Sequence, residues 1–340
     1  MEKRFLVGLL AIIFLGACND DDDGPNIMVE PPRLLAEVAP ENDAEIREFL
    51  ETHFYNYEDF ENPPPDFDFR IVIGEIEGEN AGKTPLIQQV ETVPINVSSF
   101  ELLLSEEEND IPHNLYYLSA RPTNEEVEML KMANSCEGCF PTVADSVFVS
   151  YEGKLLDGTV FDGAFNNPVW FDLARLQDLT QPVGLNMNYT ARGLSEGLPF
   201  FKKGDNVVEN GDGTVTVENF GVGLIIFPSG LGNFNRVNDM IPQYSPLMFT
   251  FNLLTLNDTD HDGDGVPSIQ EDVDGNGYLY DDNTDSDSEP LPIANFLDPD
   301  DDGDGVSTRS EISDSNDNII IPFPDANNDG IPDYLDPDTN

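Results

Sequence analysis

The sequence predicts an α+β fold, and three local patterns support that prediction. Every second residue of Val147–Tyr151 is apolar and expected to be buried, which is the period of a β-strand. The dipeptide Asp157-Gly158 lies between this run and a second one, and it is typical of a tight β-hairpin turn. Thr123 and Glu126 are spaced as a capping box before 124–133, where apolar residues are available to pack. Paired strands with short helices are therefore expected.

The composition limits the possible partners. The chain has 340 residues, which is enough for two or three domains, and its formal net charge is −52. Phosphate binding needs clustered lysine and arginine, and only 15 such residues stand against 67 acidic ones. The charge therefore argues against nucleic acid as a partner, and anionic lipid headgroups would be repelled.

The N-terminus is typical of a targeting segment. Lys3 and Arg4 precede the apolar run 5–14, which is too short to span a bilayer. The following Leu15–Cys18 resembles the bacterial lipobox. That resemblance implies cleavage of 1–18, lipidation of Cys18 and membrane attachment through the lipid, in the cell envelope and at the outer membrane. The alternative is an ordinary signal peptide with an incidental cysteine.

Two further regions precede the central one. Residues 19–40 are rich in acidic residues and proline and are expected to form a linker, and their first five resemble the export signals of surface lipoproteins in Bacteroidota-like bacteria. A plain solvated spacer is the alternative. A small module of unknown role is expected over 41–110, with a helix capped by Asn42–Glu45 and strand-like segments at 69–76 and 88–97.

Cys136 and Cys139 are the two cysteines left if Cys18 is lipidated. A Cys-x-x-Cys spacing fits a local disulfide, half of a zinc site or a redox pair. No second pair completes a zinc site, and Pro141 follows where a redox-type helix would begin. A loop disulfide is therefore the favoured interpretation.

The central region resembles the FKBP-type peptidyl-prolyl isomerases. The resemblance rests on five blocks in the family's order, with two insertions at 177–188 and 207–217. It implies an antiparallel half-barrel sheet wrapped on a short helix over 111–257, without a catalytic cofactor. The implied substrates are Pro-containing segments of unfolded or envelope proteins. The blocks are 147–162, 168–173, 191–198, 222–232 and 240–253.

The same resemblance implies a prolyl-binding cup. The Tyr151 hydroxyl and Asp162 would be its polar groups near the substrate carbonyls, and the backbone N–H of Ala191 would donate to a carbonyl. The alternative is that the aromatic residues are core residues without catalytic function. The implied cup consists of Tyr151, Phe161, Asp162, Phe171, Ala191, Leu194, Ile241 and Phe249.

Three positions depart from the family pattern. Leu194 stands where the family has a tryptophan, and Thr190-Ala191 replaces a Val-Ile pair. The family's pocket tyrosine is missing or is replaced by Asn233. One lost hydrogen bond costs about 0.5 to 1.5 kcal/mol, so we expect weakened turnover rather than none. The alternative is a binding or chaperone module with little catalysis.

The C-terminal region 258–340 has 25 acidic residues and one basic residue, Arg309. Oxygen ligands at loop positions one, three, five and twelve with glycine at six are what calcium requires. Flanking helices are not expected, because Pro267, Pro299, Pro332 and Pro337 lie within or beside the loops. The array therefore resembles thrombospondin type-3 repeats. A disordered acidic tail is the alternative, and 272–277 is a shorter variant. The candidate ligands are Asp260, Asp262, Asp264 and Glu271; Asp300, Asp302, Asp304 and Glu311; and Asp325, Asn327, Asp329 and Asp336.

Overall fold

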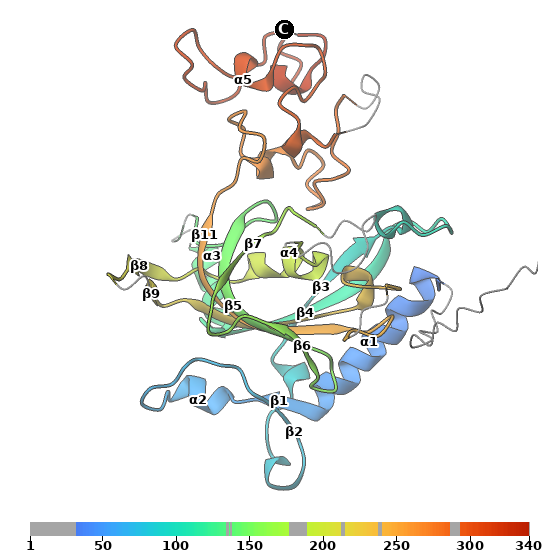
Figure 1. Ribbon diagram of the computed structural model, residues 1–340, viewed down its shortest axis with the longest axis vertical. Helices are drawn as coiled ribbons and strands as arrows, with labels where there is room; N and C mark the ends of the chain where they lie inside the picture. The colour runs from blue at the N-terminus through green and yellow to red at the C-terminus, as the bar shows by residue number, and fades with distance from the viewer. Residues whose placement is uncertain are drawn as a thin grey trace, which may run out of the picture. The chain divides into compact units, whose positions relative to one another are not determined.

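The protein is built around a seven-stranded antiparallel sheet (Figure 1). A computed structural model describes residues 32–133, 136, 138–176, 189–211, 215–236, 240–285 and 293–339. The sheet order is β3-β4-β10-β11-β5-β6, and β7 pairs with β5. The predicted α+β class with an antiparallel sheet is confirmed. The strands are β3 (Glu91–Val97), β4 (Ile111–Arg121), β5 (Ser146–Lys154), β6 (Val160–Gly163), β7 (Val169–Asp172), β10 (Gly221–Phe227) and β11 (Leu247–Asn257).

Both faces of this sheet are covered (Figure 1). Helix α4 (Arg192–Gly197) and the 3-10 turn η4 (Leu198–Phe200) cover one face, where Ile225 and Phe227 of β10 are buried. The later part of helix α1 (Leu35–Thr52), from Ile46 on, covers the other, where Leu224 and Ile226 are buried. Antiparallel sheets often leave one face to solvent, but here every residue of β10 is buried.

Helix α1 differs from the sequence prediction. It begins at Leu35 and contains Pro40, so the end of the expected linker is helical and Asn42 is not a cap. The carboxylate of Glu108 supplies the missing cap, accepting hydrogen bonds from the backbone N–H of Leu35 at 2.6 Å and of Ala36 at 3.0 Å. Burial of Leu35 and Val38 stabilises the early start despite the proline.

Smaller elements lie before β3, and one more, η3, lies between β3 and β4. Strands β1 and β2 pair with each other through three residues on each side. Among the described residues, no helix is both long and apolar enough to span a bilayer. These elements are β1 (His53–Tyr55), α2 (Tyr57–Glu61), β2 (Ile73–Glu75), η1 (Gly78–Asn80), η2 (Leu86–Gln88) and η3 (Ser99–Leu102).

The predicted hairpin and capped helix are present. Strands β5 and β6 form the hairpin, and Gly158 in its turn has a φ of +87°. Helix α3 (Asn124–Met132) begins with the predicted capping box, in which Thr123 N donates to Glu126 at 2.8 Å. Cys136 and Cys139 are disulfide-bonded in the loop that follows, as the favoured interpretation expected.

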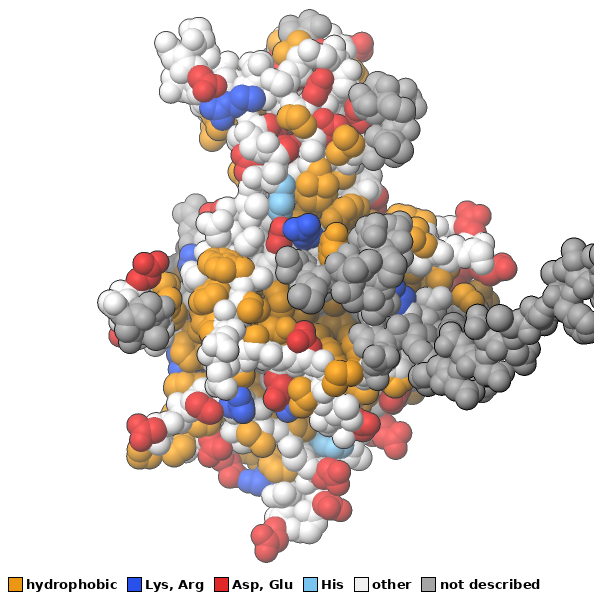
Figure 2. Space-filling model, in the orientation of Figure 1, with side chains coloured by type: hydrophobic (Ala, Val, Ile, Leu, Met, Phe, Trp, Pro, Cys, Tyr) orange, Lys and Arg blue, Asp and Glu red, His pale blue; other side chains and the backbone are white. Residues whose placement is uncertain are grey.

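A separate two-stranded hairpin, β8 (Asp205–Glu209) with β9 (Val215–Glu218), occupies the predicted second insertion. The first insertion, at 177–188, lies outside the described residues, as do the signal segment and Cys18. The short turn η5 (Ser229–Leu231) follows β10 and leads into the loop that ends at β11. Figure 2 shows apolar side chains gathered over the middle of one face, with acidic side chains distributed around them.

The acidic region after β11 consists of loops with very short helical turns. Two small apolar clusters support it, one around Leu279 and Phe296 and the other around Ile312 and Tyr334. No long helices flank its loops in the described ranges 258–285 and 293–339, as the prolines predicted. Its turns are η6 (Ser268–Glu271), η7 (Asn295–Leu297), α5 (Thr308–Glu311) and η8 (Asp333–Leu335).

Candidate functional sites

Aromatic side chains from four strands converge on the α4 side of the sheet. The ring centroid of Tyr151 lies 4.9 Å from that of Phe171 and 6.2 Å from that of Phe249. Phe161 meets Phe249 edge-on at 5.5 Å. We call this group, with the four other residues that the sequence predicted for the cup, the aromatic cup.

The strand register explains why these rings meet. Gly153 of β5 is the cross-strand partner of both Asp162 on β6 and Phe249 on β11. A β-carbon at Gly153 would lie 2.7 Å from the Phe161 ring and 2.9 Å from the Phe249 ring. Glycine is therefore required at this position, because any side chain would displace the two rings.

One polar contact joins the cup to its rim. The Tyr151 hydroxyl donates a hydrogen bond to Oδ2 of Asp162 at 2.6 Å, and Asp162 itself is exposed. Burial, with the neighbouring carboxylate, raises the pKa of Tyr151. The phenol therefore stays protonated at neutral pH and can act as a donor.

Helix α4 and the loop before β11 supply the rest of the cup. Ala191 is the N-cap residue of α4, and Leu194 N donates to its carbonyl at 2.8 Å. Thr190 Oγ1 donates to the Asp172 carbonyl at 2.7 Å, which fixes the start of α4 to β7. Leu194 and Ile241 are buried in the same apolar cluster as the rings. The structure thus brings seven of the eight predicted residues into one cluster, and Asp162 joins it through Tyr151.

A small cavity lies at the floor of the cup. It is lined by Tyr151, Phe171, Leu194 and Phe249 together with the core residues Val149, Leu198 and Phe251, and it measures about 10 Å³. That volume is on the order of one water molecule. The rings are therefore closely packed against the core behind them.

Helix α1 holds the loop between β10 and β11. The sequence did not predict this contact. Asn42 Oδ1 accepts hydrogen bonds from Ser229 N at 2.9 Å and Ser229 Oγ at 2.6 Å. Asn42 Nδ2 donates to the Tyr244 carbonyl at 2.8 Å. The loop that carries Ile241 is therefore anchored near both ends by one buried side chain. Helical periodicity could have shown that Asn42 lies on the apolar face of α1.

Asn233 lies within this anchored loop. Its side chain is buried, and its Nδ2 atom has no hydrogen-bond partner among the described residues. Leaving a buried donor unpaired costs about 1 to 3 kcal/mol, so stability alone does not account for an asparagine here. The neighbouring Phe234 is buried against Tyr244, with ring centroids 5.1 Å apart.

The acidic region brings predicted ligands together in two loops. One carboxylate oxygen from each of the first three acids of a motif lies within 4.8 Å of the others, in both the 260–264 and the 300–304 loop. Gly265 and Gly305, at position six, have φ values of +106° and +92°, as the sharp turn requires. These oxygens are suitable donors for a hard divalent cation.

A third cluster joins the two motifs. Oxygens of Asp264, Glu271 and Asp301 lie within 4.8 Å of one another, and all three side chains are at most 3 % exposed. Both carboxylate oxygens of Glu271 lack a hydrogen-bond partner among the described residues. Burial and the nearby carboxylates raise the pKa of Glu271 to about 9 and that of Asp301 to about 8. Sequence spacing missed Asp301, because its partner Glu271 belongs to the preceding motif.

Glu311 and the motif that begins at Asp325 differ from this pattern. Glu311 has two unpaired buried carboxylate oxygens, and burial raises its pKa to about 8. In the motif that begins at Asp325, Asn327 Nδ2 instead donates to Asp336 at 2.8 Å and to Asp329 at 3.2 Å. Within the described part of that motif, no three carboxylates are gathered.

Comparison with known proteins gives limited matches. Residues 261–324 match the protein family described as BamM C-terminal. The acidic region is thus similar to that family over most of its length. No curated protein matches the chain.

Two of the solved structures that match do so at low identity. A peptidyl-prolyl cis-trans isomerase from Pseudomonas syringae pv. tomato is 19% identical with a TM-score of 0.28, covering 42% of this chain and 75% of that chain. FkpA from Escherichia coli is 19% identical with a TM-score of 0.31. That match covers 65% of this chain and 62% of FkpA, so less than two thirds of FkpA is represented. These scores support no conclusion about activity.

Proposed function

We propose that the protein is a peptidyl-prolyl cis-trans isomerase that acts on Pro-containing segments of envelope proteins. The observation that carries the proposal is the hydrogen bond from the buried Tyr151 hydroxyl to the exposed Asp162, at the rim of a cup of aromatic rings. This arrangement places a hydroxyl group and a carboxylate beside an apolar surface that can take a prolyl ring.

The chemistry needs no nucleophile. Rotation about an X-Pro bond has a barrier of roughly 18 to 20 kcal/mol, because amide resonance is lost in the twisted state. A site that binds the twisted amide better than either planar form lowers this barrier. In the proposed mechanism the rings of Phe171 and Phe249 remove water from the amide, and Tyr151 with Asp162 orients its carbonyl groups.

A binding module with little turnover is the second candidate, favoured by the departures from the family pattern at Ala191, Leu194 and Asn233. Proline-isomerisation and peptide-binding assays on the lipid-free protein separate the two functions. Binding with a rate above background supports the enzyme, and binding without acceleration at micromolar protein supports the module.

We also propose that the acidic region binds calcium. Three buried carboxylates at Asp264, Glu271 and Asp301 with unpaired oxygens would repel one another unless protons or a cation neutralise them. Calcium takes six to eight oxygen ligands, which carboxylates and backbone carbonyls can supply. Such a region has little apolar surface to bury, so bound ions would supply much of its order.

The envelope location remains part of the proposal. Lipidation of Cys18 would attach the chain to the outer membrane, and the match of residues 261–324 to the BamM C-terminal family fits an outer-membrane context. Metabolic labelling with a fatty-acid analogue tests this location. Label in the wild type that is absent from Cys18→Ala supports it, and equal label in both contradicts it.

A further inference from the structure

A fourth acidic cluster joins Asp272 and Asp274, from the shorter variant of the motif at 272–277, to Asp282, which the sequence did not predict. Oxygens of Asp272, Asp274 and Asp282 lie within 4.8 Å of one another. Asp282 is 5 % exposed, and its Oδ1 accepts hydrogen bonds from Val273 N at 3.0 Å and Asp274 N at 3.3 Å. Its Oδ2 is buried and has no hydrogen-bond partner among the described residues, and the same is true of Asp272 Oδ1. Two carboxylate oxygens of this cluster are therefore buried without a partner, within a group of three negative charges.

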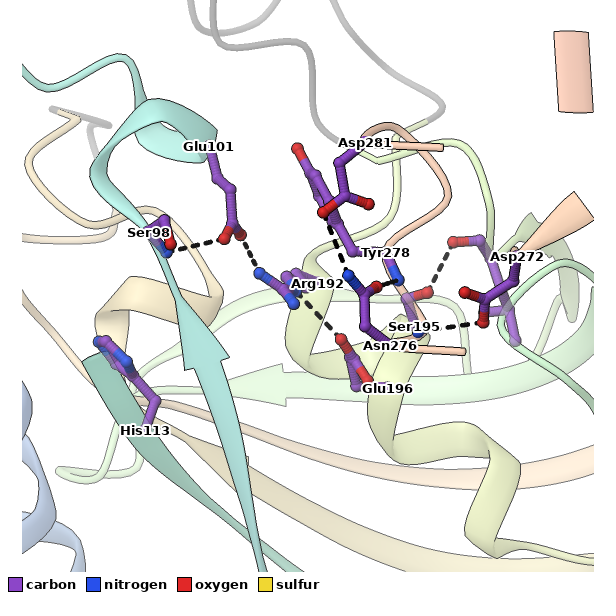
Figure 3. A network of polar contacts seen from close by, with 12 residues as sticks. Ser98, Glu101, His113, Arg192, Ser195, Glu196, Asp272, Asn276, Tyr278 and Asp281 are labelled. Carbon is purple, nitrogen blue, oxygen red and sulfur yellow. Dashed lines mark hydrogen bonds and ion pairs between the residues drawn. The ribbon is translucent and has the colours of Figure 1, made fainter. Parts of the chain in front are cut away.

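The nearby guanidinium group of Arg192 does not neutralise this cluster. Arg192 is ion-paired with Glu101 and with Glu196, its Nε lying 3.0 Å from Glu196 Oε1 (Figure 3). All three donors of the cluster are carboxylates, which suit a hard cation and not zinc or copper. Calcium tolerates irregular geometry better than magnesium, so a loop of carboxylates and carbonyls fits calcium.

The loop that contains this cluster packs on helix α4. The Arg192 guanidinium lies 4.7 Å from the centroid of the Tyr278 ring, and Phe100 meets the same ring edge-on at 6.4 Å. Asn276 ties the loop together by donating to Asp274 at 3.0 Å. It also donates to Asp281 at 3.1 Å (Figure 3). Helix α4 carries Leu194 of the aromatic cup, so the loop contacts the helix that forms one wall of the cup.

We propose that Asp272, Asp274 and Asp282 bind a calcium ion that holds residues 272–282 against α4. The ion fixes the backbone on both sides of Tyr278, and the Tyr278 ring packs against Arg192 at the start of α4. Calcium occupancy then sets how firmly the α4 wall is held. The binding step extends the calcium function proposed above, and only its effect on the cup depends on the isomerase proposal.

Calcium counting on the full chain tests the site. Asp282→Asn keeps the Oδ1 acceptor and removes the charge. Asp281→Asn is the matched control, because it removes a charge one position away and keeps a side-chain oxygen that can accept from Asn276. Equilibrium dialysis should find one fewer calcium ion per chain in Asp282→Asn than in the wild type and in Asp281→Asn. Equal counts in all three overturn the site, and an absence of binding in all three overturns the calcium function as well.

Hydrogen exchange tests the coupling to α4. In saturating calcium, amides of 272–282 and of 192–197 should exchange at least tenfold faster in Asp282→Asn than in Asp281→Asn. Tyr278→Leu should keep the full calcium count and still lose protection at 192–197, which guards against a simple folding defect. Unchanged exchange at 192–197 in both variants overturns the coupling.

Discussion

The Tyr151 hydroxyl and the Asp162 carboxylate are joined by a 2.6 Å hydrogen bond across neighbouring strands. The bond links a buried ring of the cup to an exposed acid at its rim. Register pairing of β5 with β6 produces the contact, so the same hairpin that the sequence predicts also positions both polar groups.

Tyr151→Phe keeps the ring and removes the hydroxyl. A neutral hydrogen bond contributes about 0.5 to 1.5 kcal/mol, so kcat/KM for prolyl isomerisation should fall by up to about tenfold. Thermal unfolding should show little change in stability, because Asp162 is exposed to water. Tyr117→Phe, outside the predicted cup, is the control and should leave the rate unchanged. Equal rates for both variants would show that the Tyr151 hydroxyl has no role in catalysis.

Asn42→Ala tests the anchoring of the loop that carries Ile241. Ser229 is fully buried, so its amide and hydroxyl would lose their shared partner. The free energy of unfolding should fall by about 2 to 4 kcal/mol, since unpaired buried groups cost about 1 to 3 kcal/mol each. Chemical denaturation measures the change. Glu48→Ala, exposed on α1, should change stability by less than about 0.5 kcal/mol, and an equal loss in both would contradict the anchoring role.

Removal of calcium should disorder the acidic region without unfolding the sheet. Chelation leaves Asp264, Glu271 and Asp301 without a neutralising cation, so limited proteolysis within 258–340 should become at least tenfold faster. The fluorescence of Trp170, on β7, should report an intact sheet. Cleavage at the same rate with and without millimolar calcium is the result that this account excludes.

His113 should make stability depend on pH. Burial lowers its pKa below the usual 6.5, although the backbone carbonyl of Ile111 and the nearby Glu108 oppose the shift. Between the folded-state pKa and about pH 6.5, the unfolded chain binds more protons at His113 than the folded chain does. The contribution of His113 to the free energy of unfolding is therefore complete above about pH 6.5 and is lost as the pH falls toward the folded-state pKa.

Denaturant titrations from pH 5 to 7 in saturating calcium measure this effect. His113→Gln should show a smaller fall in unfolding free energy on acidification than the wild type. His53→Gln, which replaces a partly exposed histidine on β1, is the control and should behave as the wild type. The same slope for His113→Gln and the wild type would rule out His113 as the cause.

The central fold was predictable because its signals are local. Alternation in β5 and the Asp157-Gly158 turn specify a hairpin within eighteen residues, and the observed strands follow them. The early start of α1 was not predictable, since Pro40 argues against a helix and only packing of Leu35 overrides it.

The candidate sites were predictable only in part. The resemblance supplied all eight residues of the cup, but the role of Asn42 depends on Ser229, 187 positions away. Spacing identified the acid triads at 260–264 and 300–304 as possible ligand groups. It could not identify Asp282, which stands one residue before the twelfth position of its loop, or Asp301, whose partners Asp264 and Glu271 come from the preceding loop.

Exchange spectroscopy by NMR on a proline-containing peptide tests the central claim most directly, because it measures interconversion at equilibrium without a coupling protease. The account predicts that the lipid-free protein accelerates cis-trans exchange above the uncatalysed rate, and that Asp162→Val lowers this acceleration by about tenfold or more while the fold is retained. Exchange at the uncatalysed rate with micromolar wild-type protein and bound peptide would contradict it.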